Sequence, residues 1–269
     1  MDEKIQQSDP PSHGVFLTKG MRIGIPPGGF QLRIGEDGKP NASLNFHVSI
    51  DVTNLWFDLA IDHLESALLS RQNLNSAWKN QANEEIECAL QAESLSCMQA
   101  TMASAVAIDA FYSAVKDRIT IPSSTLDAWQ KKRTARYVQV FEVLRRGFRI
   151  VKCDLPTIRQ ILKDLYRFRD VAVHPDAKLT MPIPHPTLKV STEWRFVYFR
   201  VENAEALVRT SLGLVVQLLT IPSKKYKELN SYCAERHEAF QTIVTKWEKN
   251  HGKLYLRKDQ DNKLTAQSS

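Results

Sequence analysis

The chain has 269 residues, of which 43% are hydrophobic and 25% charged, so it is long enough to bury a sizeable core. Its formal net charge of +6 tilts it modestly toward polyanionic partners but does not establish one. The first residues are polar and acidic, unlike a signal peptide, and the longest apolar run, 212–221, is too short to span a bilayer. We therefore expect a cytoplasmic protein that does not enter a membrane.

The cysteines and glycines argue against several kinds of site. The four cysteines lie far apart, with no C-x-x-C pair and no histidine at metal-ligand spacing, which is typical of the reduced thiols of an intracellular protein. The pair Gly28-Gly29 lacks the following helix and the lysine of a phosphate-binding loop, and no G-x-S-x-G motif is present. The sequence therefore predicts no bound metal and no cofactor.

Residues 1–51 predict a loose leader followed by a β-hairpin. The leader takes up about the first dozen residues. After it, apolar residues alternate along two runs, and the segment between the runs contains Asp37-Gly38, a strong turn signal for a hairpin. The alternating positions are Phe30, Leu32, Ile34, Leu44, Phe46, Val48, Ile50 and Val52.

From residue 52 onward the apolar period becomes helical. The fourth predicted helix ends before Pro175, and a Pro-rich connector then leads to TEWRFVYFRV, residues 192–201, which predicts a strand. The fold class is therefore mainly α, a helical bundle over residues 52–250 with a small β-hairpin or sheet appendage, followed by a flexible C-terminal tail at 251–269. The predicted helices cover about 55–79, 83–119, 123–150, 154–174, 202–219 and 223–250.

The fourth helix carries charged residues that packing alone does not require. At 100° per residue, Arg167, Asp170 and His174 cluster opposite the apolar stripe, and Arg169 borders that stripe. Arg169 and His174 lie about 140° apart on an ideal helix. For the two to act together, the helix must loosen at His174, before Pro175, or a second chain must complete the site. The apolar stripe consists of Ile161, Leu162, Leu165, Phe168 and Ala172.

A structural explanation of this segment also exists. Cations favour the last turn of a helix, and an Asp170–His174 pair at i, i+4 gives modest support. An arginine four to six residues ahead of a histidine also arises about once by chance in a chain of this length. What distinguishes this pair is its context, because a polar residue directly follows the arginine at the far end of a helix in a bundle.

That context resembles the HEPN superfamily (higher eukaryotes and prokaryotes nucleotide-binding domains), whose members are all-α bundles with an R-x4-6-H motif. Arg169, Asp170 and His174 match the motif with four intervening residues. Arg167 fits with six, but Phe168 follows it instead of a polar residue. The resemblance covers about residues 52–250, and the N-terminal hairpin and the predicted strand are departures from it.

The resemblance implies a metal-independent endoribonuclease that acts as a toxin or phage-defence effector. His174 would serve the proton transfers, Arg169 would stabilise the phosphorane, and Asp170 would orient His174 or hold Arg169. Active members are typically homodimers with two motifs facing one cleft, and an antitoxin or sensor protein would be a further partner beside the RNA substrate. Two alternatives stay open, namely a non-catalytic HEPN domain that binds nucleotide, RNA or a protein, and an unrelated helical interaction protein.

Two residues are candidates for supporting roles, Arg167 and Asp109. Asp109 lies in the apolar run from Ala105 to Phe111, against which we expect the apolar stripe of the fourth helix to pack. Its carboxylate would be costly to bury unpaired, so it either pairs with Arg169 or emerges at the helix surface. The basic clusters at 131–136 and 145–149 fall on several helical faces and indicate solvated surface.

Overall fold

The computed structural model describes residues 17–18, 21–35, 38–174, 179–188 and 190–254. The chain divides into two compact units, Met1–Asp51 and Val52–Ser269. The predicted leader lies outside the described residues, as does most of the predicted C-terminal tail, because residues 1–16 and 255–269 are not among them.

The first unit is built from two antiparallel strand pairs. Strand β1 (Met21–Gly24) pairs with β4 (His47–Ile50), and β2 (Phe30–Ile34) pairs with β3 (Pro40–Leu44). Phe30 lies opposite Leu44 in the inner pair. The inner pair is the predicted hairpin, and its turn reaches Gly38, whose positive φ of 74° suits glycine.

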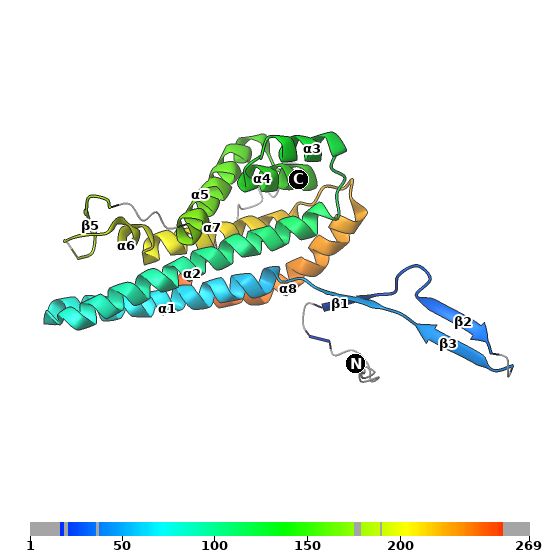
Figure 1. The fold of residues 1–269 in the computed structure, drawn as a ribbon, viewed down its shortest axis with the longest axis horizontal. Coiled ribbons are helices and arrows are strands. Elements are labelled where there is room, and N and C mark those ends of the chain that lie inside the picture. Colours follow the sequence, from blue (N-terminus) through cyan, green and yellow to red (C-terminus); the bar gives the residue numbers. More distant parts are fainter. Residues whose placement is uncertain (1–16, 19–20, 36–37, 175–178, 189, 255–269) are drawn as a thin grey trace, which may run out of the picture. The chain divides into compact units, whose positions relative to one another are not determined.

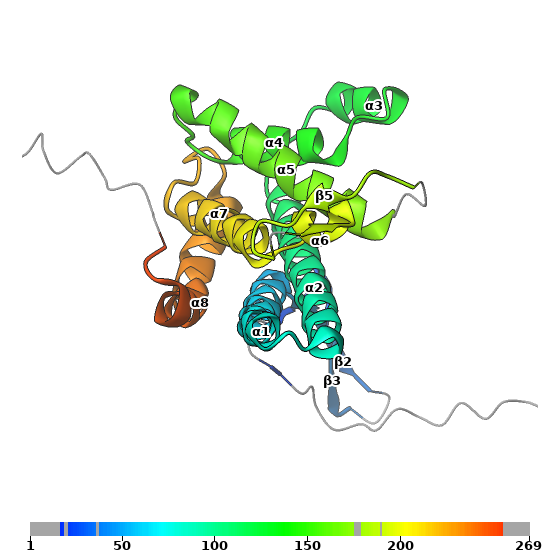
Figure 2. The same ribbon diagram turned by 90° about the vertical axis from the view of Figure 1, so that its left-hand side faces the viewer.

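The second unit is a helical bundle, which confirms a mainly α fold with small sheets. Figures 1 and 2 show α1 and α2 as two long neighbouring helices, with α7 and α5 packed beside α2 and α8 beside α1. The helices are α1 (Thr53–Asn80), α2 (Asn83–Lys116), α3 (Ser123–Lys131), α4 (Arg136–Gly147), the short 3-10 turn η1 (Lys152–Asp154), α5 (Leu155–Val173), α6 (Trp194–Tyr198), α7 (Val201–Thr220) and α8 (Lys227–His251), and a small sheet pairs β5 (Ile183–Pro184) with β6 (Ser191–Thr192).

Helix α2 is central because its middle part carries small side chains. Alanines favour the helical state and allow neighbouring backbones to approach closely, and α1, α4, α5 and α7 all pack against α2. Larger side chains from those neighbours, such as Leu64, Leu144, Leu162 and Val208, are fully buried around it. The buried small residues of α2 include Ala100, Ala103, Ser104, Ala105 and Ala107.

Two sequence predictions about this unit are wrong. The helix predicted over 123–150 is divided into α3 and α4, because Arg133 adopts a left-handed conformation with φ of 47°. Half of the strand predicted over 192–201 is helix α6, and only its first residue belongs to β6. The Glu193 carboxylate accepts a hydrogen bond of 2.7 Å from the backbone N–H of Arg195, which caps the start of α6.

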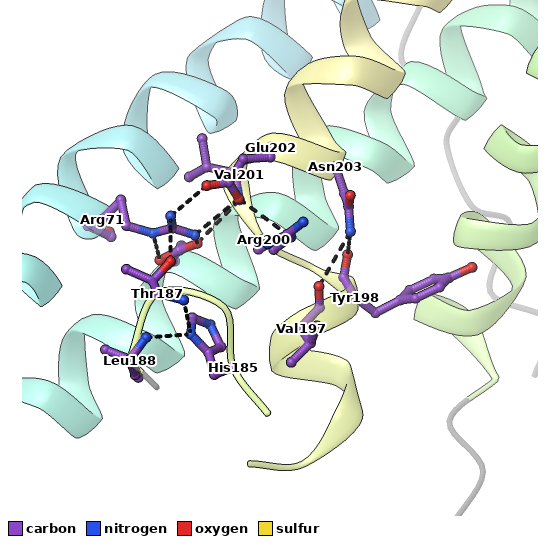
Figure 3. A network of polar contacts seen from close by, with 12 residues as sticks. Arg71, His185, Thr187, Leu188, Val197, Tyr198, Arg200, Val201, Glu202 and Asn203 are labelled. Carbon is purple, nitrogen blue, oxygen red and sulfur yellow. Dashed lines mark hydrogen bonds and ion pairs between the residues drawn. The ribbon is translucent and has the colours of Figure 1, made fainter. Parts of the chain in front are cut away.

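An ionic network around the buried carboxylate of Glu93 joins three helices to the segment between α5 and α6 (Figure 3). The Arg71 guanidinium donates to both carboxylate oxygens of Glu93, at 2.7 and 2.5 Å, and to Glu202 at 2.8 Å. It also donates to the Thr187 hydroxyl at 3.2 Å, and the backbone N–H of Val201 donates to Glu93. Burial alone would lower the pKa of Arg71, but the bonds to the two carboxylates raise it, so the guanidinium stays charged.

His185 fixes the same segment from within. Its side chain is buried, and its Nδ1 accepts hydrogen bonds from the backbone N–H groups of Thr187 and Leu188 at 3.3 and 3.2 Å. Burial lowers the pKa of His185, and the charge of Arg71 acts in the same direction, which favours the neutral ring that can accept these bonds. The segment that follows the end of α5 is therefore anchored to the bundle.

Replacing Arg71 tests how far this network supports the bundle. Arg71→Met leaves the buried Glu93 carboxylate without its cation, so we expect the free energy of unfolding to fall by about 3–5 kcal/mol in urea denaturation. Arg145→Met is the matched control, because Arg145 pairs with Glu142 at the surface, and it should cost about 0–1 kcal/mol. Adding Glu93→Gln to Arg71→Met should recover part of the lost stability. Equal losses of stability for Arg71→Met and Arg145→Met would contradict a supporting role of the network.

Candidate functional site

Helix α5 positions the candidate residues through its apolar stripe. Leu162 and Leu165 are fully buried in the core. Phe168 is half-buried and stacks on the Tyr198 ring of α6, with the ring centroids 3.9 Å apart, and it meets Phe199 edge-on at 6.0 Å. The stripe therefore fixes both the position of α5 along α2 and its rotation about its own axis.

The carboxylate of Asp109 in α2 is the centre of a polar cluster. It accepts a hydrogen bond of 2.6 Å from the Tyr166 hydroxyl and one of 2.7 Å from Arg136 Nε. Arg169 Nη1 approaches it at 3.4 Å. Of the two alternatives for Asp109, the structure shows the pairing with Arg169, although the shorter bonds come from Arg136 and Tyr166.

Two tyrosine rings support the two guanidinium groups of this cluster. The central guanidinium carbon of Arg136 lies 4.1 Å from the centroid of the Tyr112 ring, and that of Arg169 lies 4.6 Å from the Tyr166 ring. Such cation–π contacts add to the ionic bonds and restrict the orientation of each guanidinium. Arg136 and Arg169 are thus held by a carboxylate on one side and a ring on another.

The protonation states of the cluster follow from burial and from Asp109. Burial raises the pKa of the Tyr166 hydroxyl, and the negative charge of Asp109 raises it further, so this hydroxyl stays a donor. Burial alone would lower the pKa of Arg136, but the hydrogen bond and charge of Asp109 outweigh that effect and raise it. Neither group can therefore accept a proton near neutral pH.

Asp170 contacts Arg169. Its Oδ1 accepts hydrogen bonds from Nη2 and Nε of Arg169 at 2.7 and 3.1 Å. The Asp170 side chain is 58% exposed, whereas that of Asp109 is 27% exposed. Of the two roles considered for Asp170, the structure shows the contact with Arg169, and the exposed position makes this carboxylate the more easily displaced partner.

His174 ends helix α5 and faces solvent. Its backbone has φ of −117° and ψ of 74°, outside the helical region, while its N–H still donates to the carbonyl of Asp170 at 2.9 Å. The helix therefore loosens at His174, as the following Pro175 leads one to expect. Within the described part of the chain, the imidazole of His174 takes part in no hydrogen bond or ion pair.

The remaining candidate, Arg167, lies outside the Asp109 cluster. Its side chain is exposed, and its guanidinium carbon is 5.9 Å from the Tyr198 ring centroid. The structure thus brings Asp109, Arg169 and Asp170 together, places His174 at the solvent-facing end of the same helix, and sets Arg167 apart on the outward face of α5.

Three residues of the cluster escaped the sequence analysis, namely Tyr112, Arg136 and Tyr166. Arg136 is the last residue of the basic cluster 131–136, which was interpreted as solvated surface. Tyr112 follows Asp109 by three residues and Tyr166 precedes Arg169 by three, the spacing at which helical side chains meet. This spacing could have indicated the two tyrosines from the sequence. The approach of Arg136 to Asp109 could not be found in this way, because it depends on tertiary packing.

Similarity to known proteins assigns no family to this chain. No family model, no curated protein and no solved structure matches this chain. In the portion of the chain that the structure describes, no group of three or more histidine, cysteine, aspartate or glutamate side chains is placed to hold a metal ion. Within the same portion, each helix is too short or too polar to traverse a bilayer.

Substitution of the two carboxylates that contact Arg169 tests the central place of Asp109. Asp109→Ala leaves two cations and a buried hydroxyl without their acceptor, so we expect a loss of stability on the order of 2 kcal/mol in urea denaturation. Asp170→Ala is the matched control and should change stability by no more than about 0.5 kcal/mol, because this carboxylate is largely exposed. Equal effects of the two substitutions would contradict the distinction drawn between them.

Proposed function

We propose that the protein is a metal-independent endoribonuclease of the HEPN type. One observation carries the proposal. Arg169 is fixed on its inner side by Asp109 and the Tyr166 ring, and a solvent-exposed His174 leaves the same helix five residues later. The first group is a cation for a phosphate, and the second is an imidazole, which can take up a proton as a general base and return it as a general acid.

The chemistry would use the nucleophile that RNA itself carries. His174 takes the proton of a 2′-hydroxyl as its oxygen attacks the adjacent phosphorus, and Arg169 stabilises the charge on the non-bridging oxygens of the phosphorane. The bond from phosphorus to the 5′-oxygen then breaks, and the imidazolium returns a proton to that oxygen. The products are a 2′,3′-cyclic phosphate and a free 5′-hydroxyl, and no water is consumed.

Asp170 would be the group that a substrate phosphate displaces. Its Oδ1 occupies the Nε and Nη2 edge of Arg169, which is the edge suited to a two-point contact with phosphate oxygens. Because Asp170 is exposed, exchanging it for a phosphate costs less than breaking the contact with Asp109. Asp109 would keep the guanidinium in place during that exchange.

The relative positions of Arg169 and His174 favour a site completed by two protomers. Although the backbone leaves the helical region at His174, its N–H still bonds to the Asp170 carbonyl, which keeps its position close to helical. By helical geometry His174 then lies about 7.5 Å and about 140° from Arg169, so the two side chains leave α5 on different sides. In a homodimer with α5 near the two-fold axis, Arg169 of one protomer would meet the partner subunit's His174. We therefore expect light scattering to give a dimer at tens of micromolar, where standard interfaces are populated.

Mixing two inactive variants distinguishes a shared site from a site within one protomer. Co-expressed Arg169→Ala and His174→Ala chains form mixed dimers that retain one intact Arg169–His174 pair across the interface. A shared site then predicts that activity returns, whereas homodimers of either variant stay inactive. A monomer in solution, or mixed dimers without activity, would contradict the shared site.

The activity itself is tested on single-stranded RNA in the presence of EDTA. We expect cleavage that leaves 2′,3′-cyclic phosphate ends, while DNA of the same sequence survives because it lacks the attacking hydroxyl. His174→Ala should lower the rate by about 10²–10⁴-fold, because it removes the general acid–base group. Arg169→Ala should lower it by about 10²–10³-fold through lost stabilisation of the phosphorane.

Arg167→Ala is the matched control for these substitutions. It removes an arginine two residues from Arg169 and should lower the rate less than Arg169→Ala does. Circular dichroism and urea denaturation of each variant separate loss of chemistry from loss of fold. Cleavage that requires a metal and ignores His174 would contradict the proposed site.

A second candidate function is binding of nucleotide, RNA or a protein without catalysis. The observation that favours it is that Asp170 contacts Arg169, so that among the described side chains none hydrogen-bonds to His174 to orient its imidazole. Wild type and His174→Ala that are equally inert across varied RNAs, while still binding RNA, would support this candidate over the ribonuclease.

A further inference from the structure

We propose that the outward face of α5, together with the groove between α4 and α5, binds a single strand of RNA beyond the cleaved linkage. This inference rests on the proposed ribonuclease function and names where the rest of its substrate lies. The ligand would be a polyanion with repeated phosphates and exposed bases.

The outward face of α5 carries a row of cations that leads to His174. Arg159, Lys163 and Arg167 follow one another at intervals of four residues, so each is rotated by about 40° and displaced by about 6 Å from the last. On the same helical projection, Asp170 and His174 lie within the arc that these three residues span. All five side chains are exposed. The three cations, Arg159, Lys163 and Arg167, form a row whose spacing of about 6 Å is comparable to that of successive phosphates in an extended single strand.

The charges of this row are not neutralised, unlike those of other arginines in the bundle. Arg145 and Arg146 both pair with Glu142, and Arg209 pairs with Glu205. By contrast, neither Arg159 nor Lys163 has a carboxylate partner among the described residues. Arg167 contacts the ring of Tyr198, which leaves its charge available. The row is therefore a source of positive potential for a polyanion.

A groove at the far end of the row adds aromatic surface. Its volume is about 450 Å³, and Arg159 and Lys163 line it together with Tyr137 and Phe141 of α4. Both aromatic side chains are half-buried, with one side packed on the core and the other turned to the groove. The other lining residues carry no negative charge. A base that stacks on these rings would place its phosphate beside the two cations.

This combination favours single-stranded RNA over other anions. An acidic or phosphorylated peptide would satisfy the cations but has no planar base to stack in the groove. Paired bases in a duplex are stacked on one another and cannot enter the groove without being unpaired. The row along one helix also matches one backbone more closely than two.

Binding to a catalytically silenced chain tests the inference without interference from cleavage. In full-length His174→Ala, fluorescence anisotropy with a labelled single-stranded RNA 12-mer reports Kd over a range of salt concentrations. Adding Arg159→Gln and Lys163→Gln should raise Kd at least tenfold and reduce the slope of log Kd against log salt by about 1.4, as expected for two lost phosphate contacts. Tyr137→Leu, which keeps an apolar side chain but removes the ring, should raise Kd roughly tenfold.

The matched control removes two charges elsewhere on the helical unit. Lys79→Gln with Lys249→Gln, on exposed positions of α1 and α8, should change Kd by less than about twofold if the contacts are local. An equal loss in the control pair, or equal binding of duplex RNA, would overturn the proposal. So would displacement of the RNA by polyglutamate of matched charge at equal concentration, because that would identify an acidic protein as the better occupant.

The outcomes separate this inference from the ribonuclease proposal. If wild type cleaves RNA but the Arg159→Gln/Lys163→Gln pair binds and cleaves as wild type does, the binding surface is wrong and the activity stands. If RNA binding depends on the row and the groove while wild type is inert, the surface stands and the catalytic proposal is wrong.

Discussion

The carboxylate of Asp109 is the constraint on which the site depends. It receives donors from Arg136 at the first residue of α4 and from Tyr166 and Arg169 of α5, so one side chain ties three helices together. A carboxylate in an apolar helix is costly unless it accepts hydrogen bonds, and here three partners donate them. Because the partners come from distant parts of the chain, their placement requires the bundle to be folded correctly.

Helix α5 serves three purposes on different faces. Its apolar stripe packs into the core through residues such as Leu162 and Leu165. Its polar edge, with Tyr166 and Arg169, is anchored to Asp109. Its outward face carries unneutralised cations and leads to His174. The rotation of the helix, set by the stripe, therefore decides which charges are fixed inside and which remain available to a ligand.

The sequence predicted the parts of the fold that depend on local periodicity. The hairpin around Phe30 and the apolar stripe of α5 follow from alternation and from the 3.6-residue period. The break at Arg133 was not foreseen, because the segment KKRTAR contains neither glycine nor proline, and a left-handed arginine is rare. The helix at 194–198 was also missed, since β-propensity suggested a strand and the cap by Glu193 and the packing of Tyr198 on Phe168 decided otherwise.

The candidate site was predictable only where its residues lie close together in the sequence. Asp170 and His174 follow Arg169 within five residues, so a motif could point to them, and Asp109 was named as a partner of Arg169 among alternatives. Arg136, by contrast, lies 27 residues from Asp109 and 33 from Arg169, and no local pattern links them. The network of Arg71, Glu93 and Glu202 could not be predicted either, because the burial of the Glu93 charge is a property of the packed bundle.

The central claim is that Arg169 and His174 promote attack by the substrate's own 2′-hydroxyl. Its most direct test is an RNA with a single 2′-deoxynucleotide on the 5′ side of a mapped cleavage site, treated with wild type in EDTA and resolved on a sequencing gel. The account predicts that cleavage at that one linkage disappears while the other sites are cut at unchanged rates. Cleavage at the deoxy linkage at the unmodified rate would show that another nucleophile acts and would contradict the account.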